Sequence, residues 1–294
     1  MDYSFPRYLL SKQTVDDRAL NKDVLLALRN HLPPDSLSII EVGAGIGTML
    51  KRLVEWEVFC SGEYVLVDES AANLAFAQEW LPRWAAESAL TVDSIPPNRL
   101  RLTGGGRDIQ IRLETADIFD FICQNEKPAD VLIAHAFLDL LPMPESLDRL
   151  LLLTRNLAWL TINFDGVSTL LPEIDRAFDE QIEWLYHVTM DRRPTGGDSR
   201  AGRKLFQYLH ALNVDVLATG ASDWIVHANR GKYPADEKYF LQYVLSFFEN
   251  SLKGCVELNS ASFEDWLASR QEQIERGELV YIAHQMDFLV RKPE

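Results

Sequence analysis

The sequence predicts an α/β fold in which a mostly parallel sheet of seven strands has helices on both faces. Three observations predict it. Short runs of β-branched and apolar residues alternate with stretches of helical periodicity from about residue 37 to the end of the chain. The first of these runs leads into a glycine-rich turn. Acidic residues then recur where the predicted strands end, which is the edge at which open α/β sheets bind ligands.

The glycine-rich turn lies within residues 39–48. Residues 39–42 are mostly β-branched and favour a buried strand, and apolar residues from Met49 onward recur at helical spacing. Glycines between a strand and a helix let the backbone approach a ligand closely. They occupy the first, third and fifth places of the turn, as Gly43, Gly45 and Gly47. A dinucleotide-binding fingerprint needs its third glycine at the sixth place, where this chain has Thr48. Glu41 stands two residues before the first glycine.

Three further predicted strands lead into chemically useful residues, over 64–68, 109–118 and 130–139. The first ends at Asp68, about as far past the glycine turn as Rossmann-type domains place a ribose-binding carboxylate. A carboxylate there can accept hydrogen bonds from both hydroxyls of a ribose. The second ends with Asp117 and Ile118, and the third runs through His135 into a loop.

These four motifs, in this order, resemble those of class I S-adenosylmethionine-dependent methyltransferases. The resemblance implies a Rossmann-like sheet whose last strand, expected over 279–290, is antiparallel, and S-adenosylmethionine as the cofactor. It further implies that the acid of the second motif binds the ribose, that the acid of the third accepts from the adenine amino group, and that the fourth motif flanks the sulfonium. The cofactor-binding residues so implied are Glu41, Gly43, Ala44, Gly45, Gly47, Asp68, Glu69, Asp117, Ile118 and His135.

Four other stretches make the chain similar to a subgroup of bacterial stand-alone methyltransferases without an assigned substrate. They are residues 18–21, 163–166, 197–200 and 281–285. This similarity supports the enzyme class but names no acceptor.

The remaining pattern divides the chain into an N-terminal helical segment, 1–36, and a methyltransferase domain, 37–294. A helix is predicted over 14–32, with Thr14 and Asp17 as a capping box and Pro33-Pro34 as its end. Three further helices are predicted over 74–86, with a break at Pro82, over 146–156 and over 200–212. A loop is predicted over 93–108. The fifth strand is predicted over 159–164, and the sixth over 215–220 and 224–227, with a bend at Gly220.

Two helical insertions, at about 170–199 and 234–278, exceed what the sheet needs. The helix expected over 236–253 is apolar on most of its faces, which is typical of a buried helix. In the resembled family such additions build the wall and lid of the acceptor pocket. The alternative interpretation is extra core or the face of a homodimer.

Methyl transfer from a sulfonium is an in-line displacement, so the protein mainly aligns the nucleophile and excludes water. A hydroxyl or ammonium nucleophile must also lose a proton, which calls for a base. The candidate catalytic residues are His135, His187 and Asp191. His135 interrupts an apolar strand and is either a base or a contact to the cofactor. His187 and Asp191 lie four residues apart on one helical face, either as a base and the carboxylate that orients it or as a solvated surface pair.

Further polar residues are expected near the same edge of the sheet. Arginines bracket the turn at 196–198 and either bind an acidic acceptor or pair with the many acids of the chain. They are Arg192, Arg193, Arg200 and Arg203. Asp139 is expected at the pocket wall or as a helix cap, and Asn163 and Asp165 at the acceptor. Tyr8, Lys12 and Arg18 are expected to lie over the cofactor. His284 is expected to be a core histidine.

Composition limits the partners. The 294 residues have a formal net charge of −15, which disfavours a nucleic-acid backbone as partner. The cysteines, Cys60, Cys123 and Cys255, form no CxxC pair, so neither a zinc site nor a disulfide framework is indicated, and a cytoplasmic location is expected. No apolar segment is long enough for a membrane span. We therefore expect a small-molecule acceptor and no metal.

Three hypotheses remain open from the sequence. The first is an S-adenosylmethionine-dependent methyltransferase acting on an oxygen or nitrogen of a small molecule. The second is an NAD(P)-dependent oxidoreductase, which also places an acid after its second strand but needs a differently spaced glycine turn. The third is a regulatory protein that binds S-adenosylmethionine without catalysis.

Overall fold

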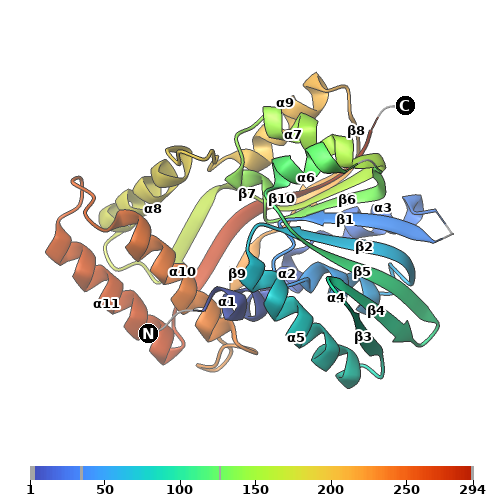
Figure 1. Cartoon of the computed structure of the whole chain (residues 1–294). Helices are drawn as coiled ribbons and strands as arrows, with labels where there is room; N and C mark the ends of the chain where they lie inside the picture. Colours follow the sequence, from blue (N-terminus) through green and yellow to red (C-terminus); the bar gives the residue numbers. More distant parts are fainter. Residues whose placement is uncertain (1–3, 34–35, 126, 293–294) are drawn as a thin grey trace.

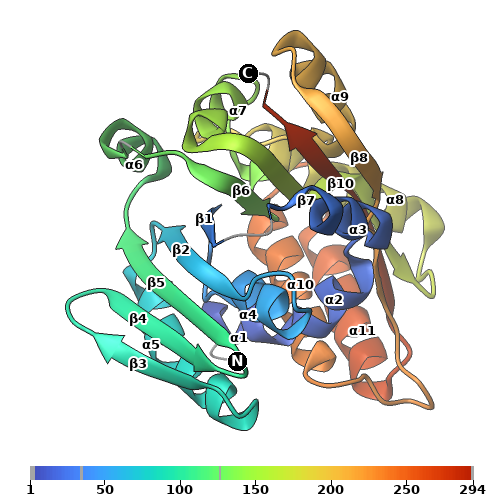
Figure 2. The same cartoon turned by 90° about the vertical axis from the view of Figure 1, so that its right-hand side faces the viewer.

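The computed structural model describes residues 4–33, 36–125 and 127–292. Within them, ten strands form one sheet in the order β3-β4-β5-β2-β1-β6-β7-β10-β8, and β9 also pairs with β10 (Figures 1 and 2). The strands are β1 (Leu37–Val42), β2 (Ser61–Asp68), β3 (Thr91–Ile95), β4 (Arg99–Gly104), β5 (Arg107–Thr115), β6 (Ala129–His135), β7 (Thr154–Leu171), β8 (Asp215–Ala221), β9 (Trp224–Val226) and β10 (Val280–Arg291).

The centre of the sheet is parallel. Strands β5, β2, β1, β6 and β7 run in one direction, and the last strand, β10, lies antiparallel between β7 and β8. Successive residues of a strand point to opposite faces, so Ile39 packs into the core on one face and Ile40 into the core on the other. The predicted α/β fold, with a mostly parallel sheet and an antiparallel last strand, is confirmed.

The predicted count of seven strands was too low. Residues 93–108, expected as a loop, instead form much of the hairpin β3–β4 and its connection to β5 at the edge of the sheet. Buried Leu100 and Leu102 alternate with exposed Arg99 and Arg101, which is the pattern of a strand with one covered face. Prolines and glycines flank this short alternation, and their presence led to the prediction of a loop.

The helices cover both faces of the sheet (Figure 1). Helices α6, α7 and α9 lie on one face, and α3, α4 and α5 on the other. Their bounds are α1 (Phe5–Ser11), α2 (Gln13–Ala19), α3 (Lys22–His31), α4 (Thr48–Glu55), α5 (Ala71–Glu87), α6 (Ile118–Gln124), α7 (Glu145–Leu150), α8 (Arg176–Asp191), α9 (Ala201–Ala211), α10 (Glu237–Leu252) and α11 (Ser260–Arg276), with 3₁₀ turns at Leu138–Leu140 and Leu151–Leu153.

The single N-terminal helix predicted over 14–32 was wrong. The chain breaks at Asn21, whose side chain accepts from the backbone amides of Asp23 and Val24 and so caps α3. The predicted capping box does not form, because the Thr14 hydroxyl donates to Glu237 on α10 and Asp17 pairs with Arg52 on α4. Helix α3 ends at His31, and Pro34, expected to close it, lies outside the described residues.

Three other boundaries differ from the predictions. The helix expected over 146–156 ends early, because β7 begins at Thr154 and continues for 18 residues. Pro82 lies within an unbroken α5. The sixth strand is interrupted between β8 and β9 and not at Gly220, because the backbone amide of Ser222 bonds Gln285 and the carboxylate of Asp223 bonds His284.

The helical insertions gather beyond one end of the sheet, where α10 packs against α1, α8 and α11 (Figure 1). Aromatic stacking joins α1 to α10, since the ring of Tyr8 lies 4.4 Å from that of Tyr243 and 5.8 Å from that of Phe240. No helix in the described part of the chain is long and apolar enough to cross a membrane.

Candidate functional site

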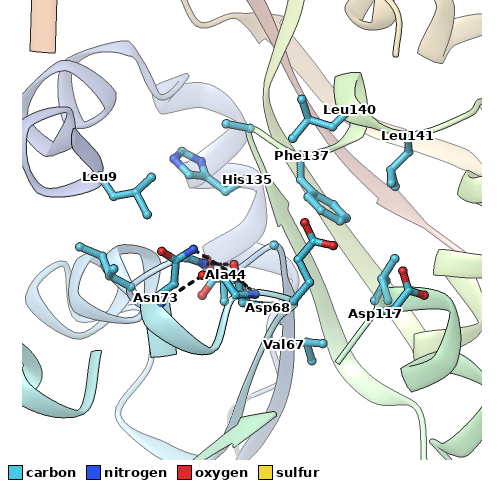
Figure 3. A pocket seen from close by; sticks show the side chains of 18 of the residues that line it. Leu9, Ala44, Val67, Asp68, Asn73, Asp117, His135, Phe137, Leu140 and Leu141 are labelled. Carbon is cyan, nitrogen blue, oxygen red and sulfur yellow. Dashed lines mark hydrogen bonds between the residues drawn. The ribbon is translucent and has the colours of Figure 1, made fainter. Parts of the chain in front are cut away.

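A cavity of about 570 Å³ opens where the carboxyl ends of β1, β2, β5 and β6 meet (Figure 3). This volume is within the range of small-molecule sites. Its walls are the glycine turn, the segments that follow β2, β5 and β6, helix α1 and a short segment after α8. The lining residues are Phe5, Leu9, Lys12, Glu41, Gly43, Ala44, Gly45, Ile46, Thr48, Val67, Asp68, Glu69, Ser70, Asn73, Ala116, Asp117, Ile118, Phe119, His135, Ala136, Phe137, Leu140, Leu141, Pro142, Arg193 and Thr195.

The cavity brings together most of the cofactor-binding residues expected from the sequence. Those that line it are Glu41, Gly43, Ala44, Gly45, Asp68, Glu69, Asp117, Ile118 and His135. Gly47 is the N-cap of α4 and is not among the lining residues. His187 and Asp191 are not among the lining residues.

The glycine turn has a backbone that other residues rarely adopt. Gly43, Gly45 and Gly47 all have positive φ, at 62°, 56° and 79°. A Cβ on Gly43 would lie 2.3 Å from the ring of Phe137, and one on Gly45 would lie 2.9 Å from Leu9 of α1. The absence of side chains here therefore lets two walls of the cavity close against the turn.

Asp68 joins the end of β2 to the glycine turn. One carboxylate oxygen accepts from the backbone amide of Gly45 at 2.7 Å, and the other accepts from the amide of Ser70 at 2.9 Å and the side chain of Asn73 at 3.1 Å. Burial raises the pKa of Asp68, and the bonds from Ser70, Gly45 and Asn73 partly offset this. A carboxylate has about four lone-pair sites, so Asp68 retains capacity for a ligand in the cavity.

Glu41 is a buried acid that lines the cavity, at 2% exposure. It accepts a hydrogen bond from the hydroxyl of Tyr64 at 2.8 Å. Burial raises the pKa of Glu41 to about 8, although the Tyr64 bond and the positive charge of Arg52 oppose this. The side chain is therefore mostly protonated at neutral pH.

Asp117 ends its strand as a helix cap. Its Oδ1 accepts from the backbone amides of Phe119 and Asp120 at the start of α6. No hydrogen bond to its Oδ2 is recorded within the described residues, which leaves one oxygen of Asp117 for a ligand.

His135 is held by hydrogen bonds at both ring nitrogens. Nδ1 lies 2.8 Å from the hydroxyl of Thr161, and Nε2 lies 3.1 Å from Oδ2 of Asp16. Burial lowers the pKa of His135 to about 4, although Asp16 opposes the change. Because ionised Asp16 can only accept, we assign the proton to Nε2 and infer that Nδ1 accepts from Thr161.

Asp16 is the centre of a buried charge cluster at 0% exposure. Besides His135, it accepts from Arg52 at 3.2 Å and from the indole of Trp224 at 2.9 Å, and the ammonium of Lys12 lies 3.6 Å away. Burial opposes ionisation of Asp16, but the attraction of Lys12, His135 and Arg52 exceeds this effect and holds its pKa well below the usual range. Of the cluster, Lys12 and His135 reach the cavity.

Two residues beside His135 have a backbone conformation that L-residues rarely adopt. Ile162, a β-branched residue, has φ of 57°, and Ala136 has φ of 52°. The amide of Ile162 is held at 2.7 Å by the carboxylate of Asp287, and the amide of Ala136 donates to the carbonyl of Thr161. These bonds fix the end of β6 against the middle of β7, where Thr161 pairs with His135.

The expected pairing of His187 with Asp191 is not what the structure shows. Asp191 accepts from the backbone amide and hydroxyl of Ser199, because the segment after α8 folds back along that helix. His187 instead bonds the hydroxyl of Ser168 at 3.1 Å, and burial lowers its pKa. The solvated alternative also fails for His187, which is partly buried against the ring of Phe164.

Several other candidates are used away from the cavity. Asn163 donates to two backbone carbonyls of β7 and β10, and Asp165 pairs with Arg203 at 2.7 Å. Arg18 pairs with Glu237, and His284 bonds Asp223 and is partly exposed, so it is not the core histidine that was expected. Of the further polar residues that the sequence placed near this edge, Lys12 and Arg193 line the cavity.

Sequence reasoning missed Asp16, Trp224, Thr161, Tyr64 and Asn73. Asn73 follows Asp68 by five residues, in the first turn of a helix, which is a spacing that could have indicated it. The others have no local signal, because their partners lie far away in the chain. Among the described residues, no group of three or more His, Cys, Asp or Glu side chains is arranged to hold a metal ion.

Known structures resemble the whole chain. A crystal structure of a Bacillus halodurans protein named as a methyltransferase matches 93% of this chain and 100% of its own, with a TM-score of 0.50 and 10% identity. The chain has the class I methyltransferase fold. A S-adenosylmethionine-dependent methyltransferase from Thiobacillus denitrificans, in complex with S-adenosylhomocysteine, matches 100% of both chains with a TM-score of 0.47 and 12% identity. The cyclopropane synthase MmaA2 of Mycobacterium tuberculosis covers 92% of this chain and 83% of its own, with a TM-score of 0.44 and 13% identity. No protein-family model and no curated protein matches the sequence.

Proposed function

We propose that this protein is a methyltransferase that moves a methyl group from S-adenosylmethionine to an oxygen or nitrogen of a small molecule. The observation that supports this most directly is the cavity itself. It places the glycine turn, Asp68, Asp117 and His135 around one space at the edge of the sheet, in a chain with the class I methyltransferase fold. Sites at this edge are typical of open α/β sheets.

The donor set fits the parts of S-adenosylmethionine. Asp68 has acceptor capacity for the ribose hydroxyls, and Oδ2 of Asp117 for the adenine amino group. Glu41 is an acceptor for the ammonium of the methionine moiety, and Lys12 is a cation for its carboxylate. Lys12 has its nearest acid at 3.6 Å, which leaves its ammonium donors available for a ligand.

S-adenosylmethionine supplies a methyl group already activated by its sulfonium, and transfer to oxygen or nitrogen yields S-adenosylhomocysteine and a proton. The protein then has to align the nucleophile and keep water out. Phe5 and Leu9 of α1 cover the cavity from one side, and Phe137 closes it against Gly43.

His135 acts in this proposal as a fixed contact at the cavity wall and not as a base. Both of its nitrogens are bonded to Thr161 and Asp16, and a pKa of about 4 makes the imidazole a weak proton acceptor at neutral pH. His187 and Asp191 do not line the cavity. We therefore propose catalysis by alignment, with the proton released to solvent.

The two other hypotheses have distinct consequences. An oxidoreductase would bind NAD(P). A dinucleotide-binding turn needs glycine at its sixth place, where this chain has Thr48, which disfavours this hypothesis. A regulatory protein would bind S-adenosylmethionine and methylate nothing.

The deciding experiment follows S-adenosylhomocysteine formation from S-adenosylmethionine across a broad panel of small hydroxyl and amine acceptors. The proposal expects at least one acceptor-dependent reaction, absent in Asp68→Ala and retained in Asp93→Ala, an exposed acid on β3. Tight cofactor binding with no turnover on any acceptor would favour the regulatory hypothesis instead.

A further inference from the structure

The cavity has a second end that the cofactor contacts leave unused. In Figure 3, Ala44, Asp68 and Asn73 lie on one side, and Phe137, Leu140 and Leu141 lie on another. This second side is apolar and continues with Pro142. Leu140 is 42% exposed and Phe5 on α1 is 43% exposed, so apolar surface extends to the rim. Exposed apolar surface of this kind at a cavity favours an apolar ligand.

Arg193 supplies the charge at this end. It follows α8, is partly buried and lines the cavity together with Thr195. Neither a side-chain hydrogen bond nor an ion pair to the Arg193 guanidinium is recorded among the described residues. Of the other cations in this segment, Arg203 pairs with Asp165 and Lys204 with Asp198, and neither Arg192 nor Arg200 lines the cavity. In a chain of net charge −15, the guanidinium of this cavity-lining arginine has no acid within ion-pair distance among the described residues.

The backbone holds Arg193 in place. A Cβ on Gly196 would lie 2.4 Å from the backbone nitrogen of Pro142, and the amide of Asp198 donates to the carbonyl of Asp139. The segment after α8 is therefore packed tightly against the loop after β6. Asp139 lies near Arg193 but forms no ion pair with it. Burial raises the pKa of Asp139 to about 6, and the positive charge of Arg193 partly opposes this increase.

Resting on the proposed function, we propose that the methyl acceptor is an apolar carboxylic acid, whose carboxylate binds Arg193 and whose body packs on Phe137, Leu140 and Leu141. The carboxylate anchors the molecule, and a separate hydroxyl or amine of the same molecule forms the new bond to the methyl carbon as the S–CH₃ bond breaks and its proton leaves to solvent. A guanidinium binds a carboxylate through two parallel hydrogen bonds. The other charged lining residues are mostly acids, namely Asp68, Glu69 and Asp117, with Lys12 as the second cation. A dianionic phosphate would be repelled by these acids more strongly than a singly charged carboxylate.

The test measures acceptor-site binding on protein already saturated with S-adenosylhomocysteine. The probes are hexanoate, octanoate and 3-phenylpropanoate, each compared with its own carboxamide, which keeps the shape and removes the charge. Calorimetric or NMR titration gives the affinity ratio of acid to amide. Arg193→Gln removes the proposed cation, and Arg192→Gln is the matched control, because Arg192 is exposed and does not line the cavity.

The proposal expects at least one acid to bind at least about tenfold more tightly than its amide, as a charge-assisted pair would give. Arg193→Gln should bring this ratio close to one, and Arg192→Gln should keep it. The proposal is overturned if no acid is preferred over its amide, or if Arg193→Gln keeps the preference. Loss of S-adenosylhomocysteine binding in Arg193→Gln also overturns it, since Arg193 would then serve the cofactor. Failure of the wild-type protein to bind S-adenosylhomocysteine is a different result, which contradicts the proposed function itself.

Discussion

The Nε2 atom of His135 lies 3.1 Å from Oδ2 of Asp16, although 119 residues separate them in the chain. This contact joins the N-terminal helices to the edge of the sheet. Asp16 also bonds Arg52 beneath the glycine turn and Trp224 in β9. One buried carboxylate therefore fixes three parts of the chain around the cavity.

We predict that Asp16→Asn lowers the free energy of unfolding by about 3–5 kcal/mol, because it leaves Arg52 buried with a weakened partner. Asp17→Asn is the matched control. Asp17 bonds the same arginine, but its side chain is 36% exposed, so its loss should cost about 1 kcal/mol or less. Urea unfolding of both variants checks this. Equal effects in the two variants would contradict the central place given to Asp16.

Stability should fall in mild acid because of His135. Its folded pKa, about 4, lies below its ordinary value of 6.5, so the folded state binds fewer protons than the unfolded state between these values. The stabilisation is complete above pH 6.5 and is lost as pH falls through this window, by on the order of 3 kcal/mol. His135→Gln, whose amide can still bond Asp16 and Thr161, should show a shallower loss by urea unfolding across the window. An unchanged slope would refute the assignment.

Asp68→Ala should weaken S-adenosylhomocysteine binding by at least about 100-fold, or roughly 2.8 kcal/mol. The substitution removes the proposed ribose acceptor and also the bonds that fix Gly45 and Asn73. Asp93→Ala, on an exposed strand, should bind normally. Calorimetric titration gives both affinities, and thermal melting shows whether Asp68→Ala remains folded. A folded Asp68→Ala protein with unchanged affinity would remove Asp68 from the site.

Cofactor binding near pH 7 should release close to one proton. Glu41 has a folded pKa of about 8, so it is mostly protonated in the free protein, and the ammonium of the ligand favours its ionised form. Titration with S-adenosylhomocysteine in buffers of different ionisation enthalpy measures the proton count. Glu41→Gln should release none. Equal release in the two proteins would assign the proton to another group.

The sequence predicted the parallel centre of the sheet and most of the cavity floor, because both depend on local patterns. Apolar runs marked β1, β2 and β6, and the turn glycines and Asp68 stand directly at strand ends. The pattern did not reveal the hairpin β3–β4, whose covered face comprises few residues. Nor did it reveal the break at Asn21, which a local cap and the distant Asp287 stabilise together.

The walls of the site were harder to predict than its floor. Asp16 occurs in a short helix with no motif, and the partners that hold it lie 36, 119 and 208 residues away. The spacing of His187 and Asp191 predicted a pair, but the nearby Ser199 takes the carboxylate of Asp191. Arg193 was one of four arginines in its segment, and its position in the cavity became visible only in three dimensions.

The most direct test of the central claim, that this cavity binds S-adenosylmethionine, is calorimetric titration of the purified protein with S-adenosylhomocysteine, with NAD as the parallel control. The account predicts saturable binding of S-adenosylhomocysteine at about micromolar strength, near −8 kcal/mol, and no binding of NAD. Saturable NAD binding without S-adenosylhomocysteine binding would contradict it and favour the oxidoreductase hypothesis.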